Sequence, residues 1–480
     1  MEVAISAVTG EIFSRFISFL INKHSYRSQA WLEEKAERLQ NLLMRVHTVV
    51  EEADGRYIMN SRMLMQLKMF SEAMYRGYHV LDTLKYQGMK DKGINKVCNS
   101  SILPFVVPVK RSRTTACARN DKVMHLELHG ALERIEIVVA NMTEFVMLLG
   151  GCDRMLRRPY DAYLYHDNIM FGRHTEKQML LNFLLQHNEE PAVLPIIGGF
   201  LVGKKTLVAH VCSNERVRLR FSSVLHLSGD NLLRILEHGG TMLGEMLVIV
   251  EFVSDVEDKD WETFHSFVKS MARGSKVIIV CKLQRLARLG SVKPMFLNIL
   301  PYEEFWYLFK TMAFGSADPI EHPELIHIAE EFAKELHMGG SLGITYSFAD
   351  VLRNNLSVQF WLSLLNKGRR VVEKNLSVFG VHLKILMEQG SPVDITDFAM
   401  RPLRVIPYTA KDPMKKELPQ VTLGELMVDP SVMPNGDFSL VSWKSKIPPY
   451  TSFAMFVSRS VQDMSEVGPL SGRKRRGVSV

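Results

Sequence analysis

The sequence lacks the features that would place it in a membrane or on a secretory route. It has no run of about eighteen or more uncharged apolar residues, the length that a membrane-spanning helix requires. Its N-terminus opens with Glu2 rather than Lys or Arg, and Glu11 and Arg15 interrupt the first apolar run. A signal peptide needs a basic start and an unbroken apolar core. We therefore expect neither a transmembrane helix nor a secretory signal.

Cysteine is also scarce. The five cysteines are odd in number and far apart, and no pair has the spacing of metal ligands. Persistent disulfides are rare in the cytosol, so such a pattern fits a reducing intracellular compartment. We expect a cytoplasmic protein with no metal site of cysteine. The cysteines are Cys98, Cys117, Cys152, Cys212 and Cys281.

The chain is basic but lacks the marks of a specific nucleic-acid binder. Its formal net charge is +7, with basic residues gathered in residues 110–122 and in the tail at 473–476. No aromatic residues interleave with these charges, and no DNA-reading motif is present. A basic run is usually a solvated loop. The alternative hypothesis is nuclear import or binding to an acidic surface, including a peripheral membrane pool.

What the sequence does contain is, first, the apolar spacing of amphipathic helices over residues 1–150. Apolar residues recur every three or four positions along residues 32–50, which aligns them on one helix face. Further helices are expected at residues 1–20, 63–86 and 122–149, with a loop at 87–121. Four such helices predict a four-helix bundle. The aligned residues are Leu32, Ala36, Leu39, Leu43, Val46 and Val50.

The helix expected at residues 1–20 is less polar than the others. Such a helix normally packs in the core of a bundle. The alternative is an element that can be released to insert at a membrane surface. Its apolar residues are Val8, Ile12, Phe13, Phe16, Ile17 and Leu20.

From about residue 170 the pattern changes to short apolar runs separated by segments of helix length. The runs are residues 193–197, 224–227, 246–250 and 276–280. This alternation predicts a parallel sheet covered by helices on both faces. A helical pattern returns over residues 301–366.

The last part of the chain has a different composition. More than half of the 19 prolines lie beyond residue 390, and we expect an irregular extension over 367–480 with a basic terminus. No internal repeat of about twenty to thirty residues is found, so no leucine-rich solenoid is expected.

The segment at residues 198–207, GGFLVGKKTL, follows an apolar run and precedes a helical one. It matches the P-loop template at Gly198, Gly203 and Lys204 and departs from it at Lys205, where Ser or Thr is expected. Glycines let backbone N–H groups wrap the phosphates, the lysine attracts the terminal phosphates, and the hydroxyl holds Mg²⁺. Thr206 supplies a hydroxyl one position late. The segment predicts a phosphate-binding loop; an ordinary glycine-rich turn is the alternative.

Two later strand ends carry charges that suit this chemistry. Glu251 follows the run at 246–250, where P-loop proteins place the carboxylate that supports the metal. Phe252 stands where hydrolysing proteins usually carry a second acid that orients or activates water. Lys282 follows the run at 276–280, and a cation there can reach the terminal phosphate. The alternative for Lys282 is an ordinary surface lysine.

In this order the segments resemble the NB-ARC module of plant NLR disease-resistance proteins, in the style seen in cereals. Residues 171–176 resemble the family's entry motif, whose backbone and arginine border the adenine. Residues 198–207 resemble its P-loop and 246–251 its Walker B strand. Residues 274–282 resemble its sensor strand, with lysine in place of arginine, and 300–315 are the most specific match.

Upstream, residues 1–150 resemble the family's Rx-type coiled-coil domain, with residues 78–82 at its acidic signature motif. The resemblance covers roughly residues 1–365. It implies a helical bundle that pairs with other NLR or signalling proteins, or with itself, and that can touch a membrane surface transiently. It also implies ADP or ATP as cofactor. The expected organisation is a bundle (1–150), a linker (151–169), a P-loop nucleotide-binding domain (170–290), a helical subdomain (291–366) and the irregular extension (367–480).

The departures from the family limit what the site is expected to do. Lys205 replaces the metal-binding Thr, Phe252 replaces an acid, and residues 339–343 lack the family's proline against the adenine. No winged-helix subdomain with a Met-His-Asp motif is recognised. We therefore expect no metal ligands, no catalytic residues and little or no hydrolysis. The residues expected to contact the nucleotide are Gly172, Arg173, Gly198, Gly199, Gly203, Lys204, Lys205, Thr206, Glu251 and Lys282.

Two hypotheses remain open on the sequence. The first is a defence-associated protein that binds ADP or ATP weakly, as a switch or scaffold. The second is an interaction protein that binds no nucleotide and keeps the loop as a folded relic. A competent ATPase is disfavoured, because positioning and charge stabilisation supply most of the rate of phosphoryl transfer.

Overall fold

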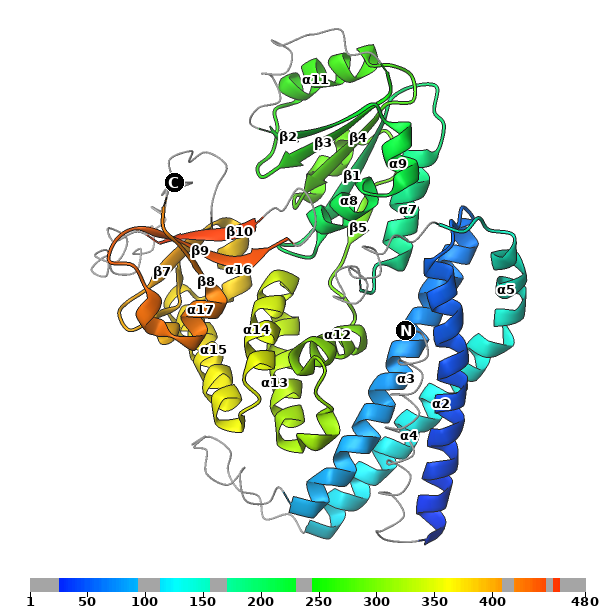
Figure 1. The fold of residues 1–480 in the computed structure, drawn as a ribbon, viewed down its shortest axis with the longest axis vertical. Helices are drawn as coiled ribbons and strands as arrows, with labels where there is room; N and C mark the ends of the chain where they lie inside the picture. Colours follow the sequence, from blue (N-terminus) through cyan, green and yellow to red (C-terminus); the bar gives the residue numbers. More distant parts are fainter. Residues whose placement is uncertain are drawn as a thin grey trace, which may run out of the picture.

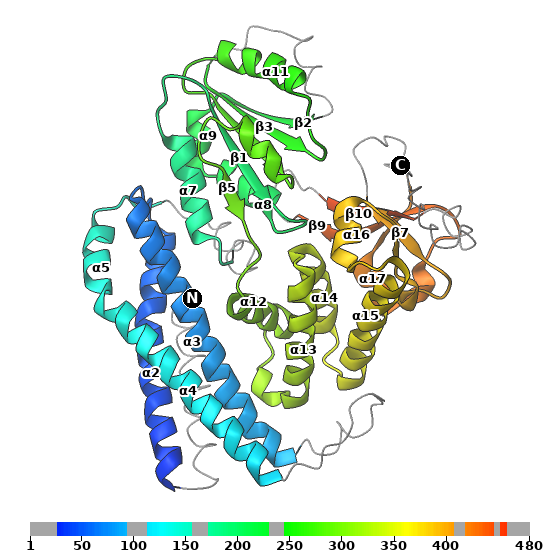
Figure 2. The ribbon, with the colours of Figure 1, turned by 180° about the vertical axis from the view of Figure 1, so that it is seen from behind.

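The computed structural model places a helical bundle beside a helical region, with a second sheet on the far side of that region and an α/β domain at one end of both (Figures 1 and 2). The helix expected at residues 1–20 and the basic tail at 473–476 lie outside the described part of the chain. The residues described are 26–93, 113–155, 171–229, 244–407, 418–445 and 452–457.

The bundle is built from three long helices, α2 (Tyr26–Asp54), α3 (Ser61–Gly93) and α4 (Arg113–Ala140), followed by the short α5 (Met142–Gly150). The stripe predicted on α2 faces the bundle core: Leu39, Leu43 and Val46 are fully buried, and Leu32 is partly buried. The loop predicted at residues 87–121 is too long, since α3 continues to Gly93 and α4 begins at Arg113.

The α/β domain contains a parallel sheet in the order β2-β3-β4-β1-β5. The four apolar runs of the sequence each form one of its strands, which confirms the predicted fold class. The fifth strand is short and was not predicted. The strands are β1 (Ala192–Gly198), β2 (Ser223–Ser228), β3 (Met246–Phe252), β4 (Lys276–Cys281) and β5 (Met295–Leu297).

Helices cover both faces of this sheet, as expected for buried parallel strands. One face packs against α7 (His174–Leu185), α8 (Lys204–Cys212) and α9 (Glu215–Arg220). The other face packs against α11 (Asp258–Ser270) and the 3₁₀ turn η4 (Gln284–Leu289). Alternate residues of β1 and β3 enter the two cores.

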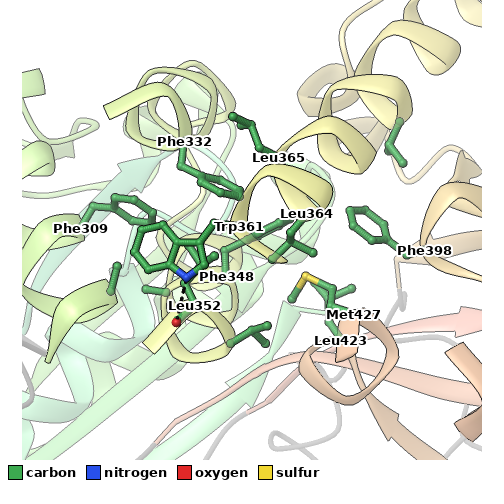
Figure 3. Packing of buried hydrophobic residues seen from close by; sticks show 14 of the residues in the cluster. Phe309, Phe332, Phe348, Leu352, Trp361, Leu364, Leu365, Phe398, Leu423 and Met427 are labelled. Atoms are coloured by element: carbon green, nitrogen blue, oxygen red, sulfur yellow. Dashed lines mark hydrogen bonds between the residues drawn. The ribbon is translucent and has the colours of Figure 1, made fainter. Parts of the chain in front are cut away.

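A helical region follows, in agreement with the predicted return to helix after residue 301. Its core surrounds Trp361, which is fully buried and donates from its indole nitrogen to the carbonyl of Leu352 at 3.1 Å (Figure 3). Phe309, Phe332 and Phe348 converge on the same core. The helices are α12 (Tyr302–Phe314), α13 (Pro323–Gly339), α14 (Leu342–Asn354), α15 (Val358–Phe379) and α16 (Leu383–Gln389).

The structure corrects the expectation of an irregular extension over residues 367–480. Within the described residues this part holds the end of α15, helix α16 and a second five-stranded sheet in the order β6-β7-β10-β9-β8. Phe438 and Leu440 of β9 are fully buried, so the sheet shares the core of the helical region. Its elements are β6 (Val393–Asp394), β7 (Arg404–Pro407), β8 (Gln420–Thr422), α17 (Leu423–Val428), β9 (Phe438–Lys444) and β10 (Ser452–Val457).

The bundle packs against the rest of the chain through what we call the docking contact, where α2 and α3 meet α7 and α12 (Figure 1). At one end, Asp54 Oδ1 lies 2.5 Å from Lys177 Nζ and 2.9 Å from His174 Nδ1. At the other, Asp82 of α3 forms an ion pair with Lys310 of α12. No helix among the described residues is long and apolar enough to cross a membrane.

Candidate functional site

The loop between β1 and α8 forms the centre of the candidate site. Gly198 has no space for a side chain, because a Cβ there would lie 2.5 Å from the carbonyl oxygen of Leu297. Gly203 adopts φ +94°, a left-handed conformation that favours glycine, and caps the N-terminus of α8. The loop therefore turns sharply from the end of a buried strand into a helix N-terminus, where free backbone N–H groups attract anions.

Lys204 turns back into the loop that precedes it. Its ammonium donates to the carbonyl oxygens of Gly198 at 2.8 Å and of Gly199 at 2.7 Å. An ammonium has three protons, so these contacts account for two of them. Burial lowers the pKa of Lys204 to about 8. The ammonium of Lys204 is thus held against the loop and is charged at neutral pH. Its third proton is available to an anion.

The side chain of Lys205 does not turn back into the loop. Its Nζ lies 2.7 Å from Oε1 of Glu251, at the end of β3, and both side chains are partly exposed. The structure therefore pairs the lysine at the hydroxyl position with the acid predicted to support a metal. Thr206 follows on α8 and is half-buried.

A cleft of about 350 Å³ opens beside the loop, in the size range of small-molecule sites. Gly198, Gly199 and Lys282 contribute to its walls, as does Lys384 of α16. The ammonium of Lys282 also donates to the carbonyl oxygen of Glu388 at the end of α16. Two cations from distant parts of the chain therefore line a cleft that borders the glycine-rich loop.

The two residues of the entry motif lie at the base of this site rather than in the cleft. Arg173 donates to the carbonyl oxygens of Asn298 at 2.6 Å and of Val202 at 3.4 Å, and burial lowers its pKa. Gly172 adopts φ +66°, and a Cβ there would lie 2.7 Å from Oε2 of Glu304. Arg173 thus ties the loop to the end of β5, and Gly172 allows the close approach of α12.

Phe252 has a structural role. It is buried in the core between the sheet and α11, 6.4 Å between ring centroids from Trp261. A side chain in that position cannot orient water. The structure thus shows that the residue predicted to stand in place of a second acid belongs to the hydrophobic core.

The tip of the loop is covered by the C-terminal part of the chain. Phe200 packs edge-on against Phe453 of β10, with ring centroids 4.8 Å apart. Leu201, which adopts φ +50°, accepts a hydrogen bond at its carbonyl from the backbone N–H of Leu342 at 3.2 Å. The second sheet, which the sequence did not predict, therefore helps to hold the loop.

The sheet order, the glycine-rich loop after β1 and the lysine that begins α8 together define the fold of a P-loop NTPase. No family model matches the sequence. Solved structures with partial similarity include a mutant of RuvB from Thermotoga maritima, 14% identical, at a TM-score of 0.29 over 53% of this chain and 95% of that one. Since this score is low, the fold assignment depends on the topology itself.

Curated relatives are plant disease resistance proteins. Disease resistance protein RGA2 of Solanum bulbocastanum is 22% identical over 334 residues, which are 63% of this chain and 33% of that protein. Disease resistance RPP13-like protein 3 of Arabidopsis thaliana is 22% identical over 372 residues, 69% of this chain and 42% of that protein. The chain thus spans less than half the length of the relatives it matches, and it is remotely similar to the NLR-type resistance proteins that its motifs resemble.

Proposed function

We propose that this protein is a plant-defence scaffold whose loop after β1 binds ADP or ATP weakly, with little or no hydrolysis. The observation that carries the proposal is a glycine-rich loop that holds the ammonium of Lys204 and borders a cleft lined by Lys282 and Lys384. The role in defence is supported by the similarity to plant resistance proteins.

The phosphates of a nucleotide suit this arrangement for two reasons. The N-terminus of α8 carries the positive end of the helix dipole and N–H groups without helical partners. Lys204 adds a charge next to these groups and has one proton beyond those used by Gly198 and Gly199. Weak binding is expected because the amines of Lys204 and Lys282 already donate to carbonyl oxygens of the chain.

Little or no hydrolysis is proposed because the groups that would drive it are otherwise engaged. Phe252 belongs to the core beside Trp261, and Glu251 pairs with Lys205. No acid of β3 is thereby left to orient an attacking water. We expect phosphate release from ATP by the full chain to be no faster than by its Lys204→Ala variant in a turnover assay.

The second candidate function is a nucleotide-free adaptor. It is favoured by the fact that the loop satisfies its own polar groups: Lys204 binds loop carbonyls, and Lys205 binds Glu251. The tip residue Phe200 is packed against Phe453. A folded relic would have the same contacts, so only a binding measurement separates the two functions.

The experiment is to denature the purified full chain, to identify released nucleotide by chromatography, and to titrate the nucleotide-free chain with ADP by calorimetry. Lys204→Ala should lose roughly 1.5–3 kcal/mol of binding free energy, because a charge-assisted contact to phosphate disappears. The matched control is Lys269→Ala, which removes an exposed lysine of α11. No binding by the unmodified chain would favour the adaptor, whereas binding that Lys204→Ala leaves unchanged would place the nucleotide site elsewhere.

The proposed partners are other NLR or signalling proteins, or further copies of this chain, bound through the bundle in the cytoplasm. A nuclear or membrane-surface pool is part of the same proposal. Support comes from the outer face of α4, where Leu126 is 71% exposed and Ile137 is 55% exposed. Leu126→Glu should reduce self-association measured by light scattering; an unchanged mass distribution would place the contact elsewhere.

A further inference from the structure

The first two residues of α8 are both lysines, and they have different partners. Successive residues of a helix point about 100° apart, so the two ammonium groups cannot occupy the same place. Lys204 reaches back to the loop carbonyls of Gly198 and Gly199, and Lys205 reaches across to Glu251 of β3. The two charges thus lie on two sides of the space in front of the helix N-terminus.

P-loop proteins hold Mg²⁺ in that space with a Ser or Thr hydroxyl from the second helix position and a carboxylate after β3. Here the second position is Lys205, which offers no acceptor to a metal. The carboxylate of Glu251 is still present, but an ammonium lies 2.7 Å from it. Mg²⁺ requires oxygen ligands in octahedral geometry and is repelled by a nearby cation. The residues present therefore do not fit the metal.

Neighbouring residues do not restore the missing ligands. Thr206 is turned about 100° along the helix from the position that faces Glu251. Phe252 is apolar and buried beside Trp261. Lys205, in contrast, is about half exposed and has a long flexible stem, so its ammonium can lie between the carboxylate and a bound phosphate.

We propose that the ammonium of Lys205 takes the place of the divalent cation at this loop, so that nucleotide phosphates bind without a metal and Mg²⁺ is excluded. The proposal rests on the proposed function, because it concerns the same loop. It follows from the pairing of Lys205 with Glu251 across the position that the metal would occupy. The ammonium of Lys205 then neutralises part of the negative charge of the phosphates, as the metal does in other P-loop proteins.

The first test is a calorimetric titration of the full chain with ADP and with ATP, in excess Mg²⁺ and in EDTA. For the unmodified chain, affinity in EDTA should equal or exceed affinity in Mg²⁺, since a metal-bound nucleotide must lose its metal to bind. Lys205→Thr should bind at least tenfold more tightly in Mg²⁺ than in EDTA. The matched control Lys269→Thr should behave as the unmodified chain. A tenfold or greater loss of affinity on chelation in the unmodified chain overturns the proposal.

The second test uses Mn²⁺ alone, followed by its paramagnetic resonance signal, and needs no nucleotide. The unmodified chain and its Glu251→Gln variant should bind Mn²⁺ equally poorly. Lys205→Thr should gain a Mn²⁺ site that Lys205→Thr combined with Glu251→Gln lacks. Binding of Mn²⁺ by the unmodified chain that Glu251→Gln removes would overturn the proposal, as would the absence of any gain in Lys205→Thr.

The two tests separate the two ideas. If neither ADP nor ATP binds in any condition, nucleotide binding is wrong, and the Mn²⁺ measurement still decides whether Lys205 excludes a metal. If nucleotide binds but requires the metal, the proposed function stands and the role of Lys205 is wrong.

Discussion

Charged side chains from distant parts of the chain meet at the docking contact and at the loop after β1, and these two places differ in burial. At the docking contact, Asp54, His174 and Lys177 have side chains only 14%, 12% and 10% exposed. At the loop, Lys205 and Glu251 are 49% and 40% exposed. A buried pair that loses one partner leaves a desolvated charge, whereas water replaces the partner of an exposed one. The first arrangement therefore fixes the position of the bundle, whereas the second pair can separate at little cost in stability.

The largest loss of stability is expected for Leu43→Glu, in the core of the bundle. Leu43 is fully buried, and its methyl groups lie against Gly77 of α3. We expect a loss of roughly 5 kcal/mol in the free energy of unfolding, from lost packing and an unpaired buried charge. A thermal melt measures it. Met44→Glu is the matched control, since Met44 is 48% exposed and should melt nearly as the unmodified chain does. If the unmodified chain, Leu43→Glu and Met44→Glu melt at the same temperature, the apolar stripe of α2 faces solvent.

The next largest effect is expected for Asp54→Asn at the docking contact. Burial alone would raise the pKa of Asp54, but Lys177 and His174 hold it well below its usual range. Removing the charge should cost roughly 4 kcal/mol of stability in a urea titration at pH 7, because Lys177 and His174 stay buried without it. The stabilisation is present above the unfolded pKa of about 3.9 and is lost as pH falls through the folded value. Asp153→Asn, at an exposed ion pair with Arg216, should change little.

A smaller effect is expected from Glu304 of α12, beside Gly172. Burial raises the pKa of Glu304 to about 8, although Arg173 opposes this. The folded protein thus holds a proton that the unfolded chain releases, and stability should fall by roughly 2 to 3 kcal/mol between pH 5 and pH 7. Glu304→Gln should reduce this slope, whereas Glu303→Gln should keep it. Identical slopes in urea titrations of both variants would contradict the assignment.

The smallest effect is expected at the loop and sharpens the comparison. Lys205→Ala breaks the pair with Glu251, but both groups are partly exposed and water screens them. The free energy of unfolding should change by less than about 1 kcal/mol. A loss as large as that of Asp54→Asn would mean that Lys205 serves the fold rather than a ligand.

The α/β sheet was accessible to sequence reasoning because its central strands are buried on both faces. Such strands appear as continuous apolar runs, as in residues 246–250, and each could be recognised without knowing its neighbours. The second sheet gives no such signal. Its strands β6, β7 and β8 are only two to four residues long, and β8 pairs with β9 across a separation of more than ten residues. Prolines between them suggested irregular chain instead.

The candidate site was predictable only where its residues are close in sequence. The loop from Gly198 to Thr206 and the acid at Glu251 follow from local patterns. Lys384 does not, because its place beside the cleft depends on how α16 packs, in a region whose fold was not predicted. The pairing of Lys205 with Glu251 was equally hidden, since it depends on the distance between α8 and the end of β3.

The docking contact also determines what a partner of the bundle would encounter. Residues 78–82, the segment that resembles the family's signature motif, face α12. The ring of Tyr78 lies 5.5 Å from that of Tyr307, the ring of His79 lies edge-on to that of Tyr302, and Asp82 pairs with Lys310. A protein that competes for this segment must first displace the chain's own helix. The apparent affinity of such a protein is scaled by the fraction of molecules in which the segment is uncovered. Residues 78–82 therefore bind a partner more weakly in the whole chain than they would if α12 did not cover them.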